Sequence, residues 1–192
     1  MANDGLLIIL SGPSGCGKGT IVSRILKERE DTILSVSVTT RAPRPGEIDG
    51  FHYRFITAEE FDNMVQRNDL LEYAQYSGNC YGTPRTAVEE HIKAGRNVIL
   101  EIDVQGALQV MQRCDDYVSV FLTVPSMEEL EKRLRGRGTE EESRVQARLT
   151  AAKEELEYVD RYQYRVLNDD LDEAVEQIHR IIETEKSRKN PQ

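Results

Sequence analysis

The sequence has no apolar run long enough to cross a membrane and no paired-cysteine motif. The apolar run near its start, residues 6–10, is far shorter than a membrane span, and the opening MANDG lacks the basic segment of a secretory signal. Its three cysteines, Cys16, Cys80 and Cys114, form no C-x-x-C pair, and their number is odd. These absences predict reduced thiols and a cytoplasmic protein rather than a secreted disulfide framework or a membrane protein.

Positive charge is also scarce. The 192 residues include 25 Lys and Arg against 34 Asp and Glu, which gives a formal net charge of −9. A broad basic surface is therefore excluded, and we expect neither nucleic acid nor membrane among the partners. The three histidines, His52, His91 and His179, show no metal-ligand spacing. Any anion site must be built locally, from backbone amides and a few arginines.

The stretch GPSGCGK directly follows the first apolar run and fits the G-x-x-x-x-G-K pattern of a phosphate-binding loop. Glycines let the backbone turn its N–H groups toward an anion, and the dipole of the following helix favours negative charge at the same place. Lys18 adds positive charge for the outer phosphates. The simpler alternative is a glycine-rich turn between a strand and a helix. The candidate phosphate-binding residues are Gly12, Pro13, Ser14, Gly15, Cys16, Gly17, Lys18, Gly19 and Thr20.

One position departs from the usual form of this loop. The Ser or Thr that normally follows the lysine and binds magnesium is replaced by Gly19, and the hydroxyl comes one residue later, at Thr20. Thr20 is therefore the candidate Mg²⁺ ligand, either directly or through a water molecule.

Strands that alternate with helices predict an α/β fold, a P-loop NTPase-type parallel sheet with helices on both faces. Strands are expected at residues 6–10, 32–38, 97–102, 117–124 and 164–167, and helices at 18–28, 85–94, up to 113, 126–134, 139–159 and 171–186. Residues 38–83 break this pattern and indicate a small, mostly β lobe inserted into the core. Its short strands are expected at 51–56, 70–76 and 80–83, with a hairpin-type turn at 77–79 and a helix from a capping box at Thr57 and Glu60.

Six segments resemble guanylate kinases and occur in the same order as in that family. They are GPSGCGKGT, SVSVTTRAPRPGEIDGFHY, LLEYAQYSGNCYGTP, ILEIDVQG, KRLRGRGTEEES and VLNDDL, and together they span nearly the whole chain. The second and third are specific to the family, whereas the phosphate loop alone fits many NTPases. The resemblance implies transfer of the γ-phosphoryl group of ATP to GMP, with dGMP as an expected second acceptor and Mg²⁺ as the metal. It also implies that ATP lies on the phosphate loop.

By this resemblance GMP binds in the inserted lobe. Glu72 matches a carboxylate that reads guanine, whose N1–H and N2–H₂ donors lie side by side as they do not in adenine. Further groups that face the base are matched by Ser37, Thr83 and Asp103. The family's clamp on the GMP phosphate is matched by Arg41, Arg44, Tyr53 and Tyr81. Guanidinium groups and phenol hydroxyls suit this role because they donate several hydrogen bonds to a phosphate dianion. Taken singly, each could be an ordinary loop charge, a solvated strand residue or a half-buried aromatic.

The resemblance further implies a helical lid over ATP. Two glycines flank Arg137, which indicates a segment able to close over a ligand, and Arg137 and Arg148 match arginines that reach the transferring phosphates. The alternative for this region is a helix with surface Glu–Arg pairs, and Arg135 is left as surface charge. Asn168 matches a position near the adenine of ATP, although it also fits as the cap of the last helix.

The expected division is a core formed by residues 1–37, 84–132 and 159–192, a GMP-binding lobe at 38–83 and a lid at 133–158. Positive charge for phosphoryl transfer is expected from Lys18, Arg41, Arg137 and Arg148. The acceptor is already a phosphate oxygen, so no strong general base is required.

Two other functions stay open at this level. A different nucleoside monophosphate kinase, such as an adenylate or uridylate kinase, would share the fold, but Glu72 and the hydroxyl set favour guanine. A non-catalytic guanylate-kinase-like module would bind phosphorylated protein segments. Such modules belong to longer multidomain scaffolds and tend to lose the phosphate loop, which this chain keeps.

Replacement of the loop lysine tests the phosphate-loop interpretation. Lys18→Ala should leave the fold intact and lower turnover by on the order of 10²-fold or more, because one preorganised positive charge is lost. Steady-state kinetics with ATP and GMP measure the loss, and circular dichroism checks the fold. Near-normal turnover in a folded variant would rule out this role for Lys18.

Overall fold

The computed structural model describes residues 4–76, 78–136 and 142–189. Its larger sheet has five parallel strands in the order β2-β7-β1-β8-β9. The strands are β1 (Leu7–Ser11), β2 (Thr32–Leu34), β7 (Asn97–Glu101), β8 (Val118–Thr123) and β9 (Tyr164–Leu167). The central strand, β1, is buried along its whole length, as the apolar run at residues 6–10 predicted.

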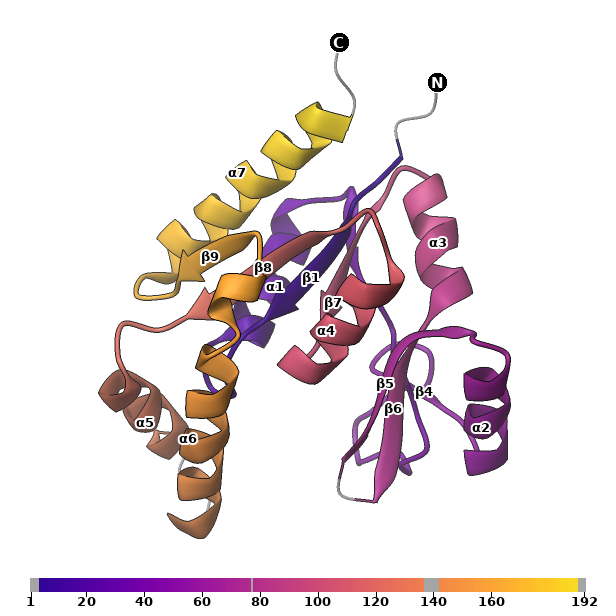
Figure 1. Ribbon diagram of the computed structural model, residues 1–192, viewed down its shortest axis with the longest axis horizontal. Helices are drawn as coiled ribbons and strands as arrows, with labels where there is room; N and C mark the ends of the chain where they lie inside the picture. Colours follow the sequence, from indigo (N-terminus) through magenta and orange to yellow (C-terminus); the bar gives the residue numbers. More distant parts are fainter. Residues whose placement is uncertain (1–3, 77, 137–141, 190–192) are drawn as a thin grey trace.

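Helices pack against both faces of this sheet, so the predicted α/β fold is confirmed (Figure 1). One hydrophobic core joins the sheet to α1 (Lys18–Glu28), α5 (Met127–Arg135), α6 (Glu142–Leu156) and α7 (Leu171–Lys189). A second core joins it to α3 (Arg85–Lys93) and α4 (Val104–Arg113). Side chains of β1 alternate between the two cores, which is the period of two that a strand buried on both faces requires.

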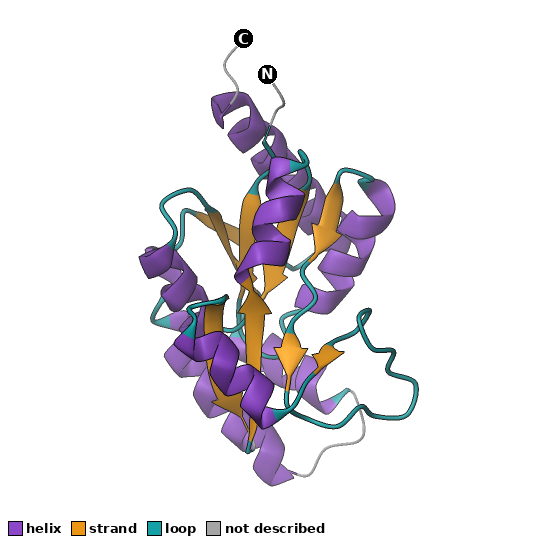
Figure 2. Ribbon diagram, turned by 90° about the vertical axis from the view of Figure 1, so that its right-hand side faces the viewer, coloured by secondary structure: helices purple, strands orange, loops and turns teal. Residues whose placement is uncertain are grey.

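A smaller, four-stranded sheet has the order β4-β3-β6-β5, and Figures 1 and 2 show it below the larger one. Its strands are β3 (Val38–Thr39), β4 (Arg54–Phe55), β5 (Leu70–Tyr76) and β6 (Asn79–Pro84). Helix α2 (Ala58–Gln66) packs on it through Phe61, in a small core with Val38 and Leu70. Thr57 and Glu60 form the predicted capping box at the start of α2. The sheet and α2 make up the separate lobe that the sequence predicted.

Three expected elements differ from the structure. The single strand expected at residues 32–38 is divided, because β2 pairs in the larger sheet, β3 pairs in the smaller one and residues 35–37 cross between them. The strand expected at 51–56 is reduced to Arg54–Phe55, since residues 50–52 form a turn. The helix expected at 139–159 ends at Leu156 and is followed by a 3₁₀ turn, Val159–Arg161. Its expected start and the serine of the 77–79 turn lie outside the described residues.

The carboxyl ends of β1 and β7 define the edge where a ligand would bind. These strands pair in parallel with Leu10 opposite Glu101, so the loop after β1 and the residues after β7 leave the sheet side by side. This edge faces the smaller sheet, whereas the start of β1 and the end of α7 lie at the opposite end of the molecule (Figure 1).

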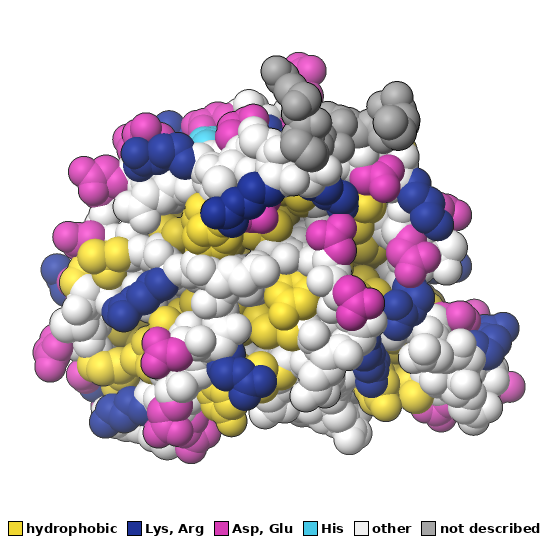
Figure 3. All heavy atoms as spheres, turned by 45° about the horizontal axis from the view of Figure 1, so that its top comes forward, with side chains coloured by type: hydrophobic (Ala, Val, Ile, Leu, Met, Phe, Trp, Pro, Cys, Tyr) yellow, Lys and Arg dark blue, Asp and Glu magenta, His cyan; other side chains and the backbone are white. Residues whose placement is uncertain are grey.

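The surface carries charges of both signs. On the face shown in Figure 3, acidic and basic side chains are intermixed. Among the described helices, none combines the length and apolar character needed to cross a membrane.

A buried amide, Asn97, ties strands of the larger sheet together. Its Oδ1 accepts the N–H of Leu6 at 3.2 Å, and its Nδ2 donates to Thr32 Oγ1 at 3.1 Å. Asn97→Leu leaves the buried N–H of Leu6 without a partner and should lower the free energy of unfolding by about 1–3 kcal/mol. Urea unfolding measures the loss. Thr32→Val is no matched control, because it removes the bond to Asn97 and also the bond of Thr32 Oγ1 to Asp31 Oδ1 at 3.0 Å. An Asn97→Leu variant as stable as wild type would contradict this account.

Candidate functional site

The loop after β1 needs glycine at several positions. Gly12, Gly15 and Gly17 have φ angles of 149°, 93° and 99°, which L side chains rarely adopt. A Cβ at Gly12 would lie 2.3 Å from the carbonyl oxygen of Leu122, and one at Gly17 would lie 2.5 Å from Asn168 Nδ2. The loop therefore requires glycine both for its backbone conformation and for space.

A hollow of about 450 Å³ opens over this loop and the start of α1. Its lining residues are Ser14, Gly15, Gly17, Lys18, Gly19, Thr20 and Glu101. The ammonium of Lys18 donates to the carbonyl oxygens of Gly12 and Pro13, the latter at 3.2 Å, so the side chain lies along the loop. Helix α1 begins at Lys18, and its N-terminal dipole favours an anion in the hollow.

Glu101, at the end of β7, faces this hollow and was not predicted as a site residue from the sequence. Burial raises the pKa of its carboxyl, while the positive charge of Lys18 opposes that shift. Glu101 also lines a second hollow, so it lies where the two meet. The sequence feature that could have identified Glu101 is its position at the carboxyl end of a buried strand, two residues before Asp103.

Asn168, the residue directly after β9, contacts the phosphate loop. It is buried, and its Nδ2 donates to the carbonyl oxygen of Cys16 at 2.8 Å. The alternative interpretation of Asn168 as a helix cap is wrong, because Asp170 Oδ1 accepts the N–H of Glu173 at 3.0 Å at the start of α7. The parallel pairing of β9 with β8 ends at Leu167 and brings the next residue against the loop.

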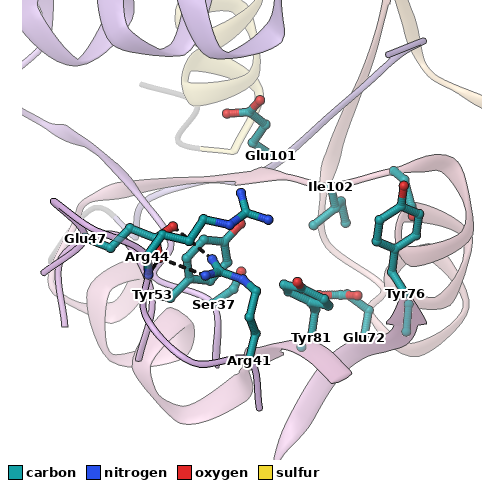
Figure 4. Close-up of a pocket in the computed structure, with 13 residues that line it drawn as sticks. Ser37, Arg41, Arg44, Glu47, Tyr53, Glu72, Tyr76, Tyr81, Glu101 and Ile102 are labelled. Atoms are coloured by element: carbon teal, nitrogen blue, oxygen red, sulfur yellow. Dashed lines mark hydrogen bonds and ion pairs between the residues drawn. The ribbon is translucent and has the colours of Figure 1, made fainter. Parts of the chain in front are cut away.

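The second hollow, of about 400 Å³, lies between the smaller sheet and the end of β7 (Figure 4). Its lining residues are Ser37, Arg41, Arg44, Glu47, Tyr53, Glu72, Ala74, Tyr76, Tyr81, Gly82, Glu101, Ile102 and Asp103. All the residues expected to bind GMP are in this set except Thr83. Thr83 is buried behind the wall and reaches the hollow through its hydrogen bond to Glu72.

A two-pronged ion pair holds Arg41 at the side of this hollow. Its Nη1 and Nη2 donate to Glu47 Oε2 and Oε1 at 2.8 and 2.9 Å, and its guanidinium lies 5.4 Å from the ring centre of Tyr53. Glu47 Oε2 also accepts the backbone N–H of Arg44 at 2.7 Å. The hydrogen bonds from the Arg41 guanidinium, and to a lesser extent the one from the Arg44 N–H, lower the pKa of Glu47 to about 2. Glu47 was not predicted as a site residue from the sequence, although an acidic residue inside an arginine-bearing turn was a visible signal.

Glu72 presents a buried carboxylate at the opposite side of the hollow. Its Oε1 accepts the hydroxyl of Thr83 at 2.6 Å. Burial raises the pKa of Glu72; the Thr83 hydrogen bond opposes the shift, and the negative charge of Asp103 adds to it. Asp103 is the N-cap of α4, where its Oδ1 accepts the N–H of Gly106 at 2.8 Å. The site thus combines a cationic side and an acidic side, as a phosphorylated ligand with hydrogen-bond donors on its base requires.

Of the two arginines expected in the lid, only Arg148 is among the described residues. Arg137 lies outside the described residues. Arg148 lies half-buried on α6 and lines neither hollow in this conformation. Arg135 pairs with Glu131 and Glu142 at the surface, in keeping with the expectation that it is a surface charge.

Comparisons with known proteins agree over nearly the whole chain. The family model described as guanylate kinase matches residues 5–185. A guanylate kinase from Desulfitobacterium hafniense is 53% identical over 186 residues, 97% of this chain and 93% of that protein. One from Lactococcus lactis is 49% identical over 188 residues, 98% of this chain and 92% of that protein.

Two solved structures are similar in fold. The crystal structure of guanylate kinase from Anaplasma phagocytophilum has a TM-score of 0.75 at 34% identity, over 96% of this chain and 87% of that one. Shikimate kinase from Bacteroides thetaiotaomicron has a TM-score of 0.50 at 18% identity, over 93% and 98%, which shows a shared fold only.

The raised pKa of Glu72 predicts a pH-dependent stability. A carboxyl with a higher pKa in the folded than in the unfolded protein destabilises the fold as the pH rises above its unfolded value. Glu72→Gln removes this cost, so the variant should resist urea better than wild type at about pH 7.5, with the advantage lost below about pH 4. Urea unfolding across this range is the measurement. A difference that does not change with pH would contradict the prediction.

Proposed function

The chain belongs to the guanylate kinase family and phosphorylates GMP with ATP, and we propose that its two adjoining hollows bind these substrates. ATP is assigned to the phosphate loop and GMP to the pocket of the smaller sheet. The observation that carries this assignment is Glu101, which lines both hollows. Phosphates bound on the two sides of Glu101 would face one another, as in-line phosphoryl transfer requires.

Arg41, Arg44, Tyr53 and Tyr81 are proposed to hold the GMP phosphate. They line one side of the pocket and offer guanidinium and phenol donors suited to a dianion. Glu47 has already ordered Arg41, so less side-chain freedom is lost when the phosphate arrives.

Glu72 is proposed to read guanine. One of its oxygens is held by Thr83, and the carboxylate lines the pocket away from the phosphate clamp. A fixed carboxylate can accept the adjacent N1–H and N2–H₂ donors of guanine, a pair that adenine and uracil do not offer. Ser37 and Asp103 line the same pocket and are assigned to the remaining polar edge of the base.

ATP is proposed to contact residues 12–20, with Asn168 near the adenine. The oxygen donors at this hollow fit Mg²⁺, since the Thr20 hydroxyl and the Glu101 carboxylate line it together and Mg²⁺ prefers hard oxygen ligands. When bound, Mg²⁺ would neutralise charge on the ATP phosphates. Thr20 and Glu101 are the residues that would hold it, with waters completing the coordination.

Phosphoryl transfer then depends on positive charge and on exclusion of water. Lys18 is assigned to the transferring phosphoryl group and Arg41 to the acceptor phosphate. Arg148 on α6 and Arg137 are also assigned to the negative charge of the transferring phosphoryl group, which they would reach from the lid. For Arg148 this requires α6 to lie closer to the phosphate loop than it does here, because Arg148 does not line that hollow. No side chain need act as a strong base.

Two finer assignments complete the proposal. We include dGMP as an acceptor, because none of the contacts assigned above is directed at the ribose 2′-hydroxyl. We assign the protein to the cytoplasm, because Cys16, Cys80 and Cys114 are free thiols, the state expected in a reducing compartment.

Selection of the acceptor base distinguishes a guanylate kinase from another nucleoside monophosphate kinase. Glu72→Gln turns one acceptor into a donor that faces a guanine donor, so kcat/KM for GMP should fall about tenfold to a hundredfold. KM for ATP should stay unchanged, and the low activity with AMP should not decrease. Coupled assays with each nucleoside monophosphate at saturating ATP measure this.

The matched control is Glu157→Gln, which removes an exposed negative charge from a residue that lines neither hollow. It should behave as wild type. If GMP efficiency were unaltered in Glu72→Gln, then Ser37, Thr83 or Asp103 would have to carry the selectivity.

A further inference from the structure

Gly106, in the first turn of α4, is buried directly beside the Glu72 carboxylate. A Cβ at Gly106 would lie 2.9 Å from Glu72 Oε2 and 3.4 Å from its Cδ, closer than carbon and oxygen atoms normally approach. The backbone of Gly106 is helical, with no positive φ, so its conformation does not call for glycine. Glycine is a poor helix former, and its presence here is explained by the space that Glu72 occupies.

The two oxygens of Glu72 are fixed from two different parts of the fold. Oε1 accepts the hydroxyl of Thr83 from β6 at 2.6 Å, and Oε2 lies over Gly106 of α4. The N–H of Gly106 is not free to bind Glu72, because it donates to Asp103 Oδ1 at 2.8 Å. Gly106 therefore acts on Glu72 through shape, by leaving room for the carboxylate.

The backbone on both sides of Glu72 is also held by α4. Gln109 Oε1 accepts the N–H of Tyr73 at 3.2 Å, and Gln109 Nε2 donates to the carbonyl oxygen of Tyr73 at 2.9 Å. Arg113 Nη1 donates to the carbonyl oxygen of Leu71 at 3.2 Å. With the neighbouring peptide groups tied to the same helix, β5 has little freedom to retreat from a bulkier residue at 106. The flexible end of Glu72 would move instead.

We propose that Gly106 is a positioning residue for guanine selection, because its missing side chain sets where the Glu72 carboxylate meets the base. Base reading then depends on helix α4 of the core as well as on the inserted lobe. This inference rests on the proposed role of Glu72 as the guanine reader.

Gly106→Ala tests the inference directly. The variant should keep at least wild-type resistance to urea, because alanine is the better helix former and only a flexible side-chain end must shift. KM for GMP should rise about tenfold, since displaced polar groups lose hydrogen-bond geometry, with KM for ATP unchanged. The preference for GMP over IMP, which lacks the N2 amine, should fall by a similar factor. Gln112→Ala, an exposed position on the same helix, is the matched control and should change none of these.

A double-mutant cycle with Glu72→Gln separates the inference from the assignment on which it rests. Once Glu72 no longer reads the base, Gly106→Ala should add less than about a twofold further loss for GMP. If Glu72→Gln alone leaves GMP efficiency unchanged, the assignment of Glu72 fails and the inference falls with it. If Glu72→Gln lowers it but Gly106→Ala does not, only the inference is overturned. Equal losses for GMP and ATP in Gly106→Ala, or a loss of stability, would show a general structural role and overturn it as well.

Discussion

The register between β1 and β7 determines where the chemistry of this protein can take place. With Leu10 opposite Glu101, the phosphate loop leaves one strand beside the point where Glu101 and Asp103 leave the other. The Ser11 hydroxyl donates to the carbonyl oxygen of Ile102 at 2.9 Å and joins the two strand ends. A shift by one residue would exchange the two faces of a strand that is buried on both. The hydrophobic cores therefore fix the spacing between the phosphate loop and the carboxylates.

The carboxylates of the two hollows are in opposite electrostatic situations. Burial raises the pKa of Glu72, so this carboxylate weakens the fold when it is ionised. The pKa of Glu101 is also raised, but this residue is exposed at the end of β7 and the positive charge of Lys18 opposes the shift. Glu47 is stabilised as an anion by Arg41 and by the backbone of Arg44, which lowers its pKa. Glu72 and Glu101 both line hollows in which a ligand can supply the missing partners, which under the proposed assignment are the guanine donors for Glu72 and a metal ion for Glu101. Glu47 already has its partners, and its effect on the ligand passes through Arg41.

Local pattern in the sequence was enough to predict the parallel core. The buried run at residues 6–10 and the start of α1 at Lys18 follow from periodicity and from the glycine-rich loop. The division of residues 32–38 between two sheets was not predictable in this way, because it depends on which distant strands pair with each half. The capping box of α2 was predictable because both of its bonds lie within four residues.

The site residues also divide into those that the sequence segments predicted and those that depend on distant partners. Those carried by family-specific segments, such as Arg41, Glu72 and Tyr81, line one pocket as a group. Glu47, Glu101 and Gly106 were missed because their importance comes from neighbours far along the chain or across a turn: Gly106 matters only because Glu72 lies against it. Asn168 was misread as a possible cap because its partner, the carbonyl of Cys16, is 152 residues away.

Helix α4 connects the edge of the larger sheet to the inserted lobe. Its N-terminal turn carries Asp103 and Gly106, and its later turns bind the backbone of β5 through Gln109 and Arg113. Any closure of the lobe over bound nucleotides must therefore move β5 together with α4 or break these bonds. These bonds join side chains of α4 to main-chain groups on either side of Glu72 and hold that residue against the helix. Under the proposed assignment, base reading is therefore attached to the core through α4, whereas the arginine-bearing turn of residues 41–47 lies on the far side of the pocket from Glu72 (Figure 4).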